Sequence, residues 1–181
     1  MYGMINKAVE ALVKETWGDA TWIEICKDAD VDPLGFLTME QYDDAITYRL
    51  VASASKISGL PADDILRVYG EFFISFTSKE GYGLLLKAAG SNLAEFLSNM
   101  DNMHSRISST FTKASPPSFR VEKLGEGELR LHYITHRDGL APLVEGLLAG
   151  LGKMFNTPVT TTLEASKAGG ADHDIFIVKY G

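Results

Sequence analysis

The side chains in this sequence that are best suited to metal or acid–base chemistry are four histidines and one cysteine. They are His104, His132, His136, His173 and Cys26. None of them stands in the Cys-x-x-Cys or His-Glu-x-x-His arrangement typical of structural zinc sites and zincin proteases. The sequence therefore excludes a disulfide framework and zinc sites of these kinds, and metals that need several protein ligands are not expected.

His104 is set apart from the other histidines because it is the ionisable residue on an apolar helical stripe. The other members of the stripe recur at three- and four-residue steps and so share one helix face: Leu93, Phe96, Leu97, Met100, Met103 and Ile107. Histidine packs readily in protein interiors and is also a common metal ligand. The spacing alone therefore permits either a hydrogen-bonded core histidine or a ligand in an apolar pocket.

A second candidate group consists of Tyr133, Thr135 and Arg137, which are two residues apart. On a strand this spacing places all three side chains on one face. Two hydroxyls and a guanidinium can hold carboxylates or phosphates through charge-assisted hydrogen bonds. The alternative is a solvated sheet face with ordinary cross-strand pairs.

The segment 172–174 has the sequence Asp-His-Asp, which resembles a fragment of a metal or acid–base site. Neighbouring residues on a strand face opposite ways, so a turn carrying a solvated His173 is the favoured interpretation. A small hydrolase that uses His136 or His173 is one hypothesis for the function, but no Gly-x-Ser-x-Gly turn supplies a nucleophile. The segment 81–83 is not followed by Lys-Ser or Lys-Thr, so it is predicted to be a turn rather than a phosphate-binding loop.

The composition describes the kind of chain that must position these groups. Its 181 residues are 45% hydrophobic, which is typical of one globular domain, here 1–181. A net charge of −7 has the wrong sign for binding nucleic acid or anionic lipid. No apolar run is long enough for a membrane span, and the first ten residues do not resemble a signal peptide. We therefore expect a cytoplasmic protein with neither nucleic acid nor membrane as a partner.

The periodicity changes from helical to strand-like after the prolines at 116 and 117, so the predicted class is α+β. Helical signals include a capping box formed by Thr21 and Glu24, and another formed by Asn92 and Glu95. Glycines at 146, 150 and 152 in the last helix are predicted to allow close backbone approach. Helices are predicted from Ile5 to Gly18, from Thr21 through Ala29, from about Asp44 to Gly59, from Pro61 through Phe76, around 84–86, from Asn92 through Ile107 and over 140–155; strands are predicted around 119–121 and over 129–133, 159–163 and 175–180, with a hairpin turn at 125–127.

Several separated segments of the chain form a set of motifs, which read MYGMINKA at 1–8, GSNLAEFL at 90–97, MDNMH at 100–104, PPSF at 116–119 and LHYITHRDGL at 131–140. Together, and in this order along essentially the whole chain, they resemble the haem-nitric oxide/oxygen binding (H-NOX) family, including its cyanobacterial stand-alone members and the β-subunit haem domain of soluble guanylate cyclase. The resemblance implies a helical distal subdomain, a proximal subdomain with a small antiparallel sheet and helices, and haem b (iron protoporphyrin IX) between them. The resemblance further implies a sensor rather than an enzyme.

The resemblance also implies roles for particular residues. His104 corresponds to the histidine that binds the haem iron, and Pro117 to the proline that presses on the porphyrin. The family's Tyr-x-Ser-x-Arg signature for the haem propionates lies on Tyr133, Thr135 and Arg137, with threonine in place of serine. A threonine hydroxyl can make the same hydrogen bond. Two further matches are Tyr2, near the pocket, and Asp44, near the propionate-binding arginine.

The distal residues implied by the resemblance predict which gas is bound. Oxygen-binding members carry a distal tyrosine where this chain has Leu143, and a second polar position is occupied by Phe73. With Ile5 these side chains form an apolar pocket. Bound O₂ carries partial negative charge and needs a hydrogen-bond donor, whereas NO does not. We expect a sensor that binds NO and CO, excludes O₂ and signals through loss of the iron–histidine bond.

The family implies that a histidine kinase or a cyclic-nucleotide enzyme reads this signal in trans, unless the chain is part of a longer polypeptide. The alternative function is a haem-free interaction module, in which His104 belongs to the core and the Tyr133 face docks a partner. The sequence leaves open the identity of the partner.

Overall fold

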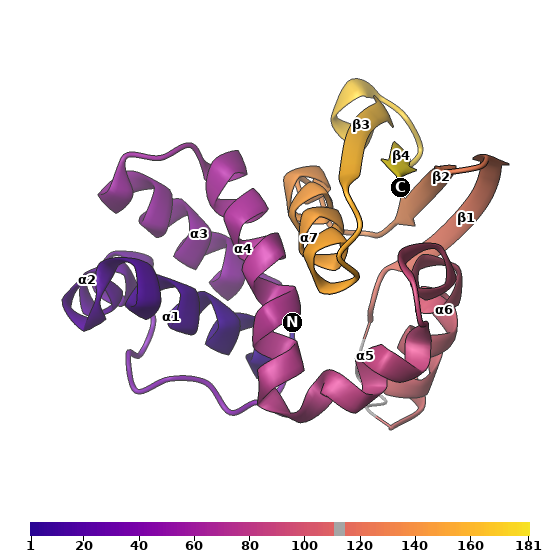
Figure 1. The fold of residues 1–181 in the computed structure, drawn as a ribbon. Coiled ribbons are helices and arrows are strands. Elements are labelled where there is room, and N and C mark those ends of the chain that lie inside the picture. The colour runs from indigo at the N-terminus through magenta and orange to yellow at the C-terminus, as the bar shows by residue number, and fades with distance from the viewer. Residues whose placement is uncertain (111–114) are drawn as a thin grey trace.

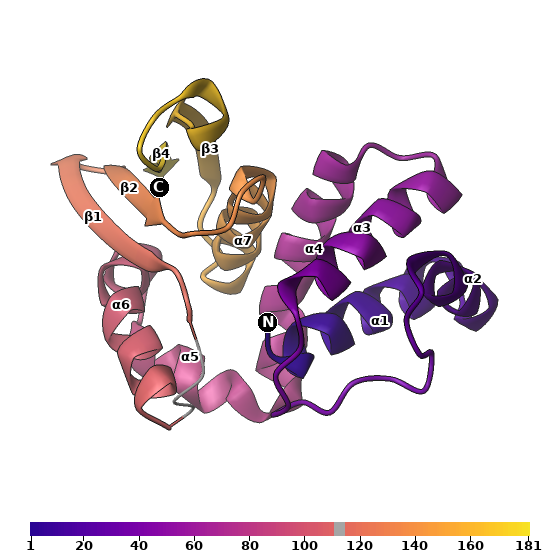
Figure 2. The ribbon, with the colours of Figure 1, turned by 180° about the vertical axis from the view of Figure 1, so that it is seen from behind.

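The computed structural model describes residues 1–110 and 115–181, which form a helical part and a sheet-containing part (Figure 1). Helices α1 to α4 lie on one side, while the sheet and α6 lie on the other, with α7 beside α4 and α5 joining the two parts (Figure 2). Among the described residues, no helix is both long enough and apolar enough to span a bilayer. The predicted α+β class is confirmed.

Among the described helices, α3 and α6 begin at side-chain caps. Asp43 caps α3 by accepting a hydrogen bond from the Ala45 amide at 2.9 Å, and Gly59 ends this helix in the left-handed conformation. Asn92 accepts from the Glu95 amide at 3.0 Å before α6. The helices are α1 (Gly3–Trp17), α2 (Asp19–Ala29), α3 (Asp44–Ser58), α4 (Ala62–Thr77), the π-helical turn η1 (Ser78–Tyr82), α5 (Gly83–Ala89), α6 (Leu93–Thr110), α7 (Ala141–Met154) and the 3₁₀ turn η2 (Lys167–Gly169).

The capping box predicted at Thr21 and Glu24 is wrong. Helix α2 starts at Asp19, directly after Gly18, whose φ of 87° lets the chain turn sharply out of α1. Thr21 therefore lies inside the helix, where its hydroxyl donates to the Trp17 carbonyl at 2.9 Å. The true start is set by a glycine turn rather than by a side-chain cap.

The sheet is antiparallel throughout, with the strand order β1-β2-β4-β3. Its strands are β1 (Ser118–Gly125), β2 (Glu128–Ile134), β3 (Val159–Ala165) and β4 (Asp174–Tyr180). The β1–β2 hairpin turns at Gly127, where φ is 68°, as predicted. Leu129, Leu131 and Tyr133 are buried on one face of β2, while Arg130 on the other face is partly exposed. The buried face lies toward α6 (Figure 1).

Helices α4 and α7 pack closely because glycines remove the side chains between their backbones. A Cβ atom on Gly146 would lie 2.0 Å from the Arg67 carbonyl oxygen, and one on Gly70 would lie 2.3 Å from the Leu143 carbonyl oxygen. Neither distance is compatible with a side chain unless the backbone moves. The predicted close approach at the glycines of the last helix is therefore found, and it joins α7 to the helical part.

Candidate functional site

His104 lies on α6 with its ring half-buried and held in one orientation. Its Nδ1 atom is 3.0 Å from the carbonyl oxygen of Pro117. A carbonyl can only accept, so Nδ1 carries the proton and Nε2 keeps its lone pair. Burial lowers the pKa of His104, although the Pro117 carbonyl and the charge of Asp101 act in the opposite direction. The residue therefore presents a neutral imidazole nitrogen, the form that binds metals.

Asp101, one turn earlier on α6, ties the following segment to the same helix. Its carboxylate accepts hydrogen bonds from the Ser118 hydroxyl at 2.8 Å and from the Phe119 amide at 2.5 Å. The Phe119 ring lies 5.7 Å from the His104 ring and 5.2 Å from the Tyr133 ring, centre to centre. Metal-binding histidines usually donate their other nitrogen to a fixed acceptor, which for His104 is the Pro117 carbonyl. The orienting role of Asp101 was not predicted, because it depends on a contact across 17 residues of sequence.

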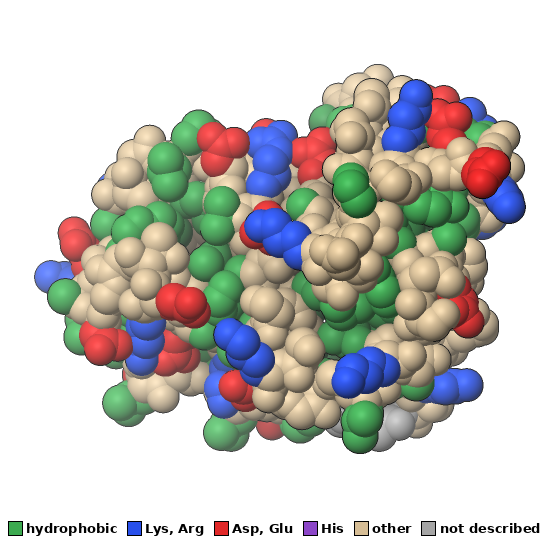
Figure 3. All heavy atoms as spheres, viewed as in Figure 1, with side chains coloured by type: hydrophobic (Ala, Val, Ile, Leu, Met, Phe, Trp, Pro, Cys, Tyr) green, Lys and Arg blue, Asp and Glu red, His purple; other side chains and the backbone are tan. Residues whose placement is uncertain are grey.

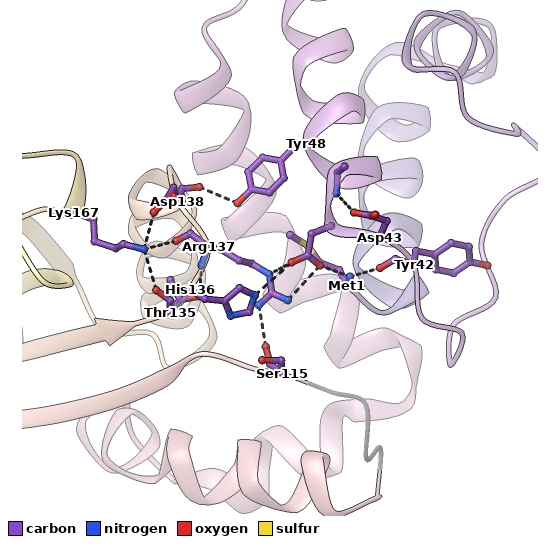
Figure 4. A network of polar contacts seen from close by, with 12 residues as sticks. Met1, Tyr42, Asp43, Tyr48, Ser115, Thr135, His136, Arg137, Asp138 and Lys167 are labelled. Carbon is purple, nitrogen blue, oxygen red and sulfur yellow. Dashed lines mark hydrogen bonds and ion pairs between the residues drawn. The ribbon is translucent and has the colours of Figure 1, made fainter.

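Arg137 and Asp44 form the centre of a polar network between the helical part and the chain beyond β2 (Figure 4). Arg137 donates from Nε and Nη2 to the two carboxylate oxygens of Asp44 at 2.7 and 3.3 Å, and from Nη1 to the Ser115 carbonyl at 2.9 Å. The amino terminus at Met1 also binds Asp44. Burial raises the pKa of Asp44, but the bonds from Arg137 and the amino terminus outweigh it and hold the pKa below its ordinary value.

The guanidinium has donors left for another anion. Toward the described residues, Arg137 uses three of its five N–H groups. Its side chain is only 13% exposed, so a carboxylate that bound here would be screened little by solvent. His136 points to the same aspartate at 3.7 Å but is 62% exposed.

The prediction that Tyr133, Thr135 and Arg137 share one strand face is wrong for the last two residues. Strand β2 ends at Ile134, which pairs with Ser118, the first residue of β1. Two prolines precede Ser118 and cannot donate ladder hydrogen bonds, so the pairing does not continue beyond this point. The chain then turns, and the Thr135 hydroxyl accepts from the Arg137 amide at 3.2 Å. Lys167 fixes the turn by donating to the carbonyls of Thr135 and Arg137 at 3.1 and 3.3 Å.

Tyr133 remains close to this turn despite the change of course. It is buried, and burial raises its pKa to about 12 against the opposing effect of a hydrogen bond with Thr135. The three residues therefore still gather hydroxyl groups and a guanidinium at the end of β2. The turn, rather than the pleat of a strand, brings them together.

The apolar residues Ile5, Phe73 and Leu143 converge on one turn of α4. The Tyr69 hydroxyl donates to the Ile5 carbonyl at 2.9 Å, the Tyr69 and Phe73 rings are 5.8 Å apart, and the Leu143 carbonyl rests against Gly70. All three apolar side chains are partly buried against the core. Hydrophobic side chains also line a hollow bounded by α7, α5 and α6 (Figure 3).

Tyr69 is a residue that the sequence did not single out for this region. Burial raises the pKa of Tyr69 above its ordinary value, so its hydroxyl stays protonated. The proton is already donated to the Ile5 carbonyl, a contact between residues 64 positions apart that no spacing rule reveals. Tyr2 lies beside this region, half-buried just before α1, and pairs with Gln41 in an isolated β-bridge.

The residues gathered here suit a flat apolar cofactor with acidic groups at one edge. Partly buried apolar side chains can cover the faces of such a group, Nε2 of His104 can bind a metal ion at its centre, and Arg137 can hold a carboxylate. Haem has all three properties. The donor set therefore fits haem, with one imidazole sufficing because the porphyrin supplies the other metal ligands.

The structure gives no support to a hydrolase at the remaining histidines. The prediction that His173 is solvated is wrong. Its side chain is 17% exposed and is held by Asp172 and His132. Cys26 is fully buried in α2, and burial raises the pKa of its thiol to about 11. The cysteine is therefore unsuited to act as a nucleophile.

Comparison with known proteins gives a family and a set of relatives. The model of the Haem-NO-binding family matches residues 2–163. Soluble guanylate cyclase gcy-37 of Caenorhabditis elegans is 33% identical over 99% of this chain and 27% of its own length. The soluble guanylate cyclase subunit beta-2 of Rattus norvegicus is 35% identical over 63% of this chain and 18% of its own length. The chain thus spans about a quarter or less of the length of these relatives.

Solved structures share the fold at lower identity. An H-NOX protein from S. oneidensis in the Fe(II)NO state superposes with a TM-score of 0.91 at 18% identity, covering 100% of this chain and 99% of that one. The Fe(II) unliganded H-NOX protein from K. algicida gives a TM-score of 0.85 at 23% identity, covering 100% and 97% of the two chains. These structures confirm the arrangement of helices and sheet in the residues that the structure describes.

Proposed function

The chain belongs to the Haem-NO-binding family, also called H-NOX, and on that premise we propose that it binds NO and CO at ferrous haem, excludes O₂ and signals by releasing His104. The family assigned from the sequence is confirmed, and it is a family of haem-binding gas-sensor domains rather than enzymes. We take residues 1–181 as one such domain. Haem b is the proposed cofactor.

Each group of the site has a proposed part in holding haem. Bound haem supplies a ferrous iron that takes gaseous ligands. His104 provides the protein's ligand to that iron through Nε2, whose lone pair is directed by the bond from Nδ1 to Pro117. Arg137 offers its remaining N–H groups to a propionate, beside the hydroxyls of Tyr133 and Thr135. Pro117 is proposed to press on the porphyrin as well as to orient the histidine.

The proposed selectivity against O₂ rests on three side chains that we assign to the distal side of the haem, Ile5, Phe73 and Leu143. Ile5, Phe73 and Leu143 carry no hydrogen-bond donor. Tyr69 does carry one, but its hydroxyl donates to the Ile5 carbonyl at 2.9 Å and is not offered to a ligand. Bound O₂ needs a donor for its partial charge, and NO and CO do not. The pocket therefore favours NO and CO over O₂.

The proposed signal starts at α6. Asp101 and His104 connect this helix to the segment 117–119, while Arg137 and Asp44 connect the turn after β2 to α3. When His104 is released, α6 loses its attachment to the cofactor and the balance between two arrangements of these parts shifts. We propose that a histidine kinase or a cyclic-nucleotide enzyme such as a guanylate cyclase reads the change.

The observation that carries the proposal is the fixed His104 tautomer, with Nδ1 bonded to Pro117 and Nε2 directed away from that bond. The test is electronic absorption of the reduced protein under argon, NO, CO and air. We expect a Soret band that shifts with NO and CO and does not change to a stable oxy form in air. His104→Gly should lose the ferrous spectrum and regain it with added imidazole, whereas His136→Gln should resemble the unchanged protein.

Two results would contradict the proposal. A stable oxy spectrum would refute the exclusion of O₂. A folded protein that takes up no haem would refute the sensor function and favour the haem-free interaction module instead.

A further inference from the structure

The short turn that carries Arg137 is held in place by side chains rather than by other backbone groups. Among the residues that the structure describes, no backbone–backbone hydrogen bond involves residues 135–139, which lie between β2 and α7. Three carbonyl groups of this turn instead accept hydrogen bonds from the side chains of Lys167 and Tyr48 (Figure 4). The position from which Arg137 extends its guanidinium therefore depends on these two side chains.

Lys167 holds the turn from the side of the sheet. Its ammonium group donates to the carbonyl oxygens of Thr135 and Arg137 at 3.1 and 3.3 Å, and it forms an ion pair with the Asp138 carboxylate at 2.7 Å. A lysine ammonium has three N–H groups, and these three contacts use all of them. Lys167 therefore has no donor left for a haem propionate, and it acts on the site through the backbone of the turn.

Lys167 is itself anchored by a buried carboxylate. Asp174, the first residue of β4, is only 5% exposed and accepts a hydrogen bond from the backbone amide of Lys167 at 2.9 Å. The residue that pairs with Asp174 on β2 is Tyr133. Because its backbone is anchored and its side chain is only 23% exposed, Lys167 loses little further conformational freedom when it binds the turn.

Tyr48 holds the same turn from the helical part of the protein. It belongs to α3, and its hydroxyl donates to the Asp138 carbonyl at 2.9 Å. Burial raises the pKa of Tyr48, so the hydroxyl keeps its proton at neutral pH and remains a donor. Helix α3 also carries Asp44, the carboxylate that binds Arg137. The backbone of the turn is therefore fixed from two sides, by the sheet part and by α3.

We propose that Lys167 and Tyr48 are positioning residues for haem, an inference that rests on the proposed haem function. Asp44 fixes the outer end of the Arg137 side chain, while Lys167 and Tyr48 fix the backbone from which that side chain extends. With both ends held, the remaining N–H groups of Arg137 have one direction in which to meet a propionate. Binding groups that are supported in this way lose little freedom when the ligand arrives. Lys167 and Tyr48 act through the turn and not by touching haem.

The test compares Lys167→Met and Tyr48→Phe with the unchanged protein in the transfer of haem to an excess of apomyoglobin. Each variant keeps most of the side chain and removes its donors. We expect release about 2- to 10-fold faster in each, the effect of losing one or two ordinary hydrogen bonds. Tyr48→Phe changes no charge, so it separates positioning from a direct attraction between the lysine and a propionate. Circular dichroism establishes that each variant is folded.

Two further lysine variants separate the proposed role from a general effect on the fold. Lys167→Arg keeps the charge and the donors and should restore slow release. Lys153→Met is the matched control, because this lysine is 71% exposed and pairs with Glu71, away from the turn. Its haem release should equal that of the unchanged protein.

Hydrogen–deuterium exchange of the protein as purified gives a readout that does not depend on haem release. The Arg137 amide donates to the Thr135 hydroxyl within the turn. This amide should exchange faster in Lys167→Met and Tyr48→Phe, while the amides of α1 exchange as in the unchanged protein. Faster exchange along the whole chain would indicate a loss of overall stability and would contradict a local positioning role.

The outcomes distinguish this inference from the proposed function. If the unchanged protein takes up haem and both Lys167→Met and Tyr48→Phe release it at the unchanged rate, the positioning role is overturned and the haem function stands. If the unchanged protein takes up no haem, the proposed function is refuted and the positioning role with it.

Discussion

Replacement of Arg137 by alanine tests whether the polar end of the site holds haem. The guanidinium is 13% exposed and is fixed by Asp44 at 2.7 and 3.3 Å and by the Ser115 carbonyl at 2.9 Å. Its other two N–H groups are those that we assign to a propionate. The substitution removes these donors together with the charge.

The size of the effect follows from the number of bonds lost. A hydrogen bond to a charged group contributes about 1.5–3 kcal/mol, which corresponds to a change of about 10- to 150-fold in a dissociation constant or rate. Loss of one such bond sets the lower limit, because two N–H groups are available. We expect Arg137→Ala to release haem at least ten times faster than the unchanged protein.

The assay is transfer of haem to an excess of apomyoglobin, followed through the Soret band. Arg67→Ala is the matched control, because this arginine pairs with Asp64 and Glu145 on the helical part and does not contact Asp44. Its haem release should be unchanged. Circular dichroism separates loss of haem from loss of fold, since Arg137→Ala also leaves Asp44 with fewer partners. Release within twofold of the unchanged protein would refute the proposed contact to a propionate.

Three further predictions concern packing, pH and gas selectivity. Gly146→Ala places a methyl group 2.0 Å from a backbone oxygen of α4 and should lower the free energy of unfolding by about 1–3 kcal/mol or more in urea titration; Gly125→Ala, with open space around it, should not. Because its cationic partners hold the pKa of Asp44 below its ordinary value, the stability they provide is complete above about pH 5 and is lost as the pH falls through the folded-state pKa. The Tm difference between the unchanged protein and Asp44→Asn should therefore narrow below about pH 4, and a difference that persists unchanged to pH 2 would contradict this. The reduced Leu143→Tyr variant should form a stable oxy spectrum in air, which the unchanged protein should not, because the added hydroxyl can donate a hydrogen bond to bound O₂; a reduced variant that shows no oxy spectrum would argue against Leu143 facing the ligand.

Local patterns predicted the elements of this fold better than the details of their ends. Apolar residues at helical spacing and the glycine turn at Gly127 depend on near neighbours, so they can be read directly from the chain. The start of α2 could not be predicted in this way, because Gly18 turns the backbone before the apparent cap at Thr21. The end of β2 depends on where its partner strand starts, and two prolines on a different segment decide that point.

The site shows the same division between local and distant information. His104, Arg137 and the nearby Asp44 were found through the family resemblance, but the hydrogen bonds that orient the histidine and the guanidinium were not. The carbonyl that fixes His104 lies 13 residues away, and the carboxylate that holds Arg137 lies 93 residues away. The His132–His173 contact spans 41 residues. Neither ring signals the pair by itself, because alternation along a strand states which face a side chain occupies and not what it meets there.

The measurement that tests the central claim most directly is resonance Raman spectroscopy of the ferrous protein before and after addition of NO. The account predicts an iron–imidazole stretching band that is present in the reduced protein, absent from His104→Gly and lost when NO binds. A band that remains in His104→Gly would show that another residue binds the iron. A band that persists in the unchanged protein at saturating NO would contradict the release of His104 on which the proposed signal depends.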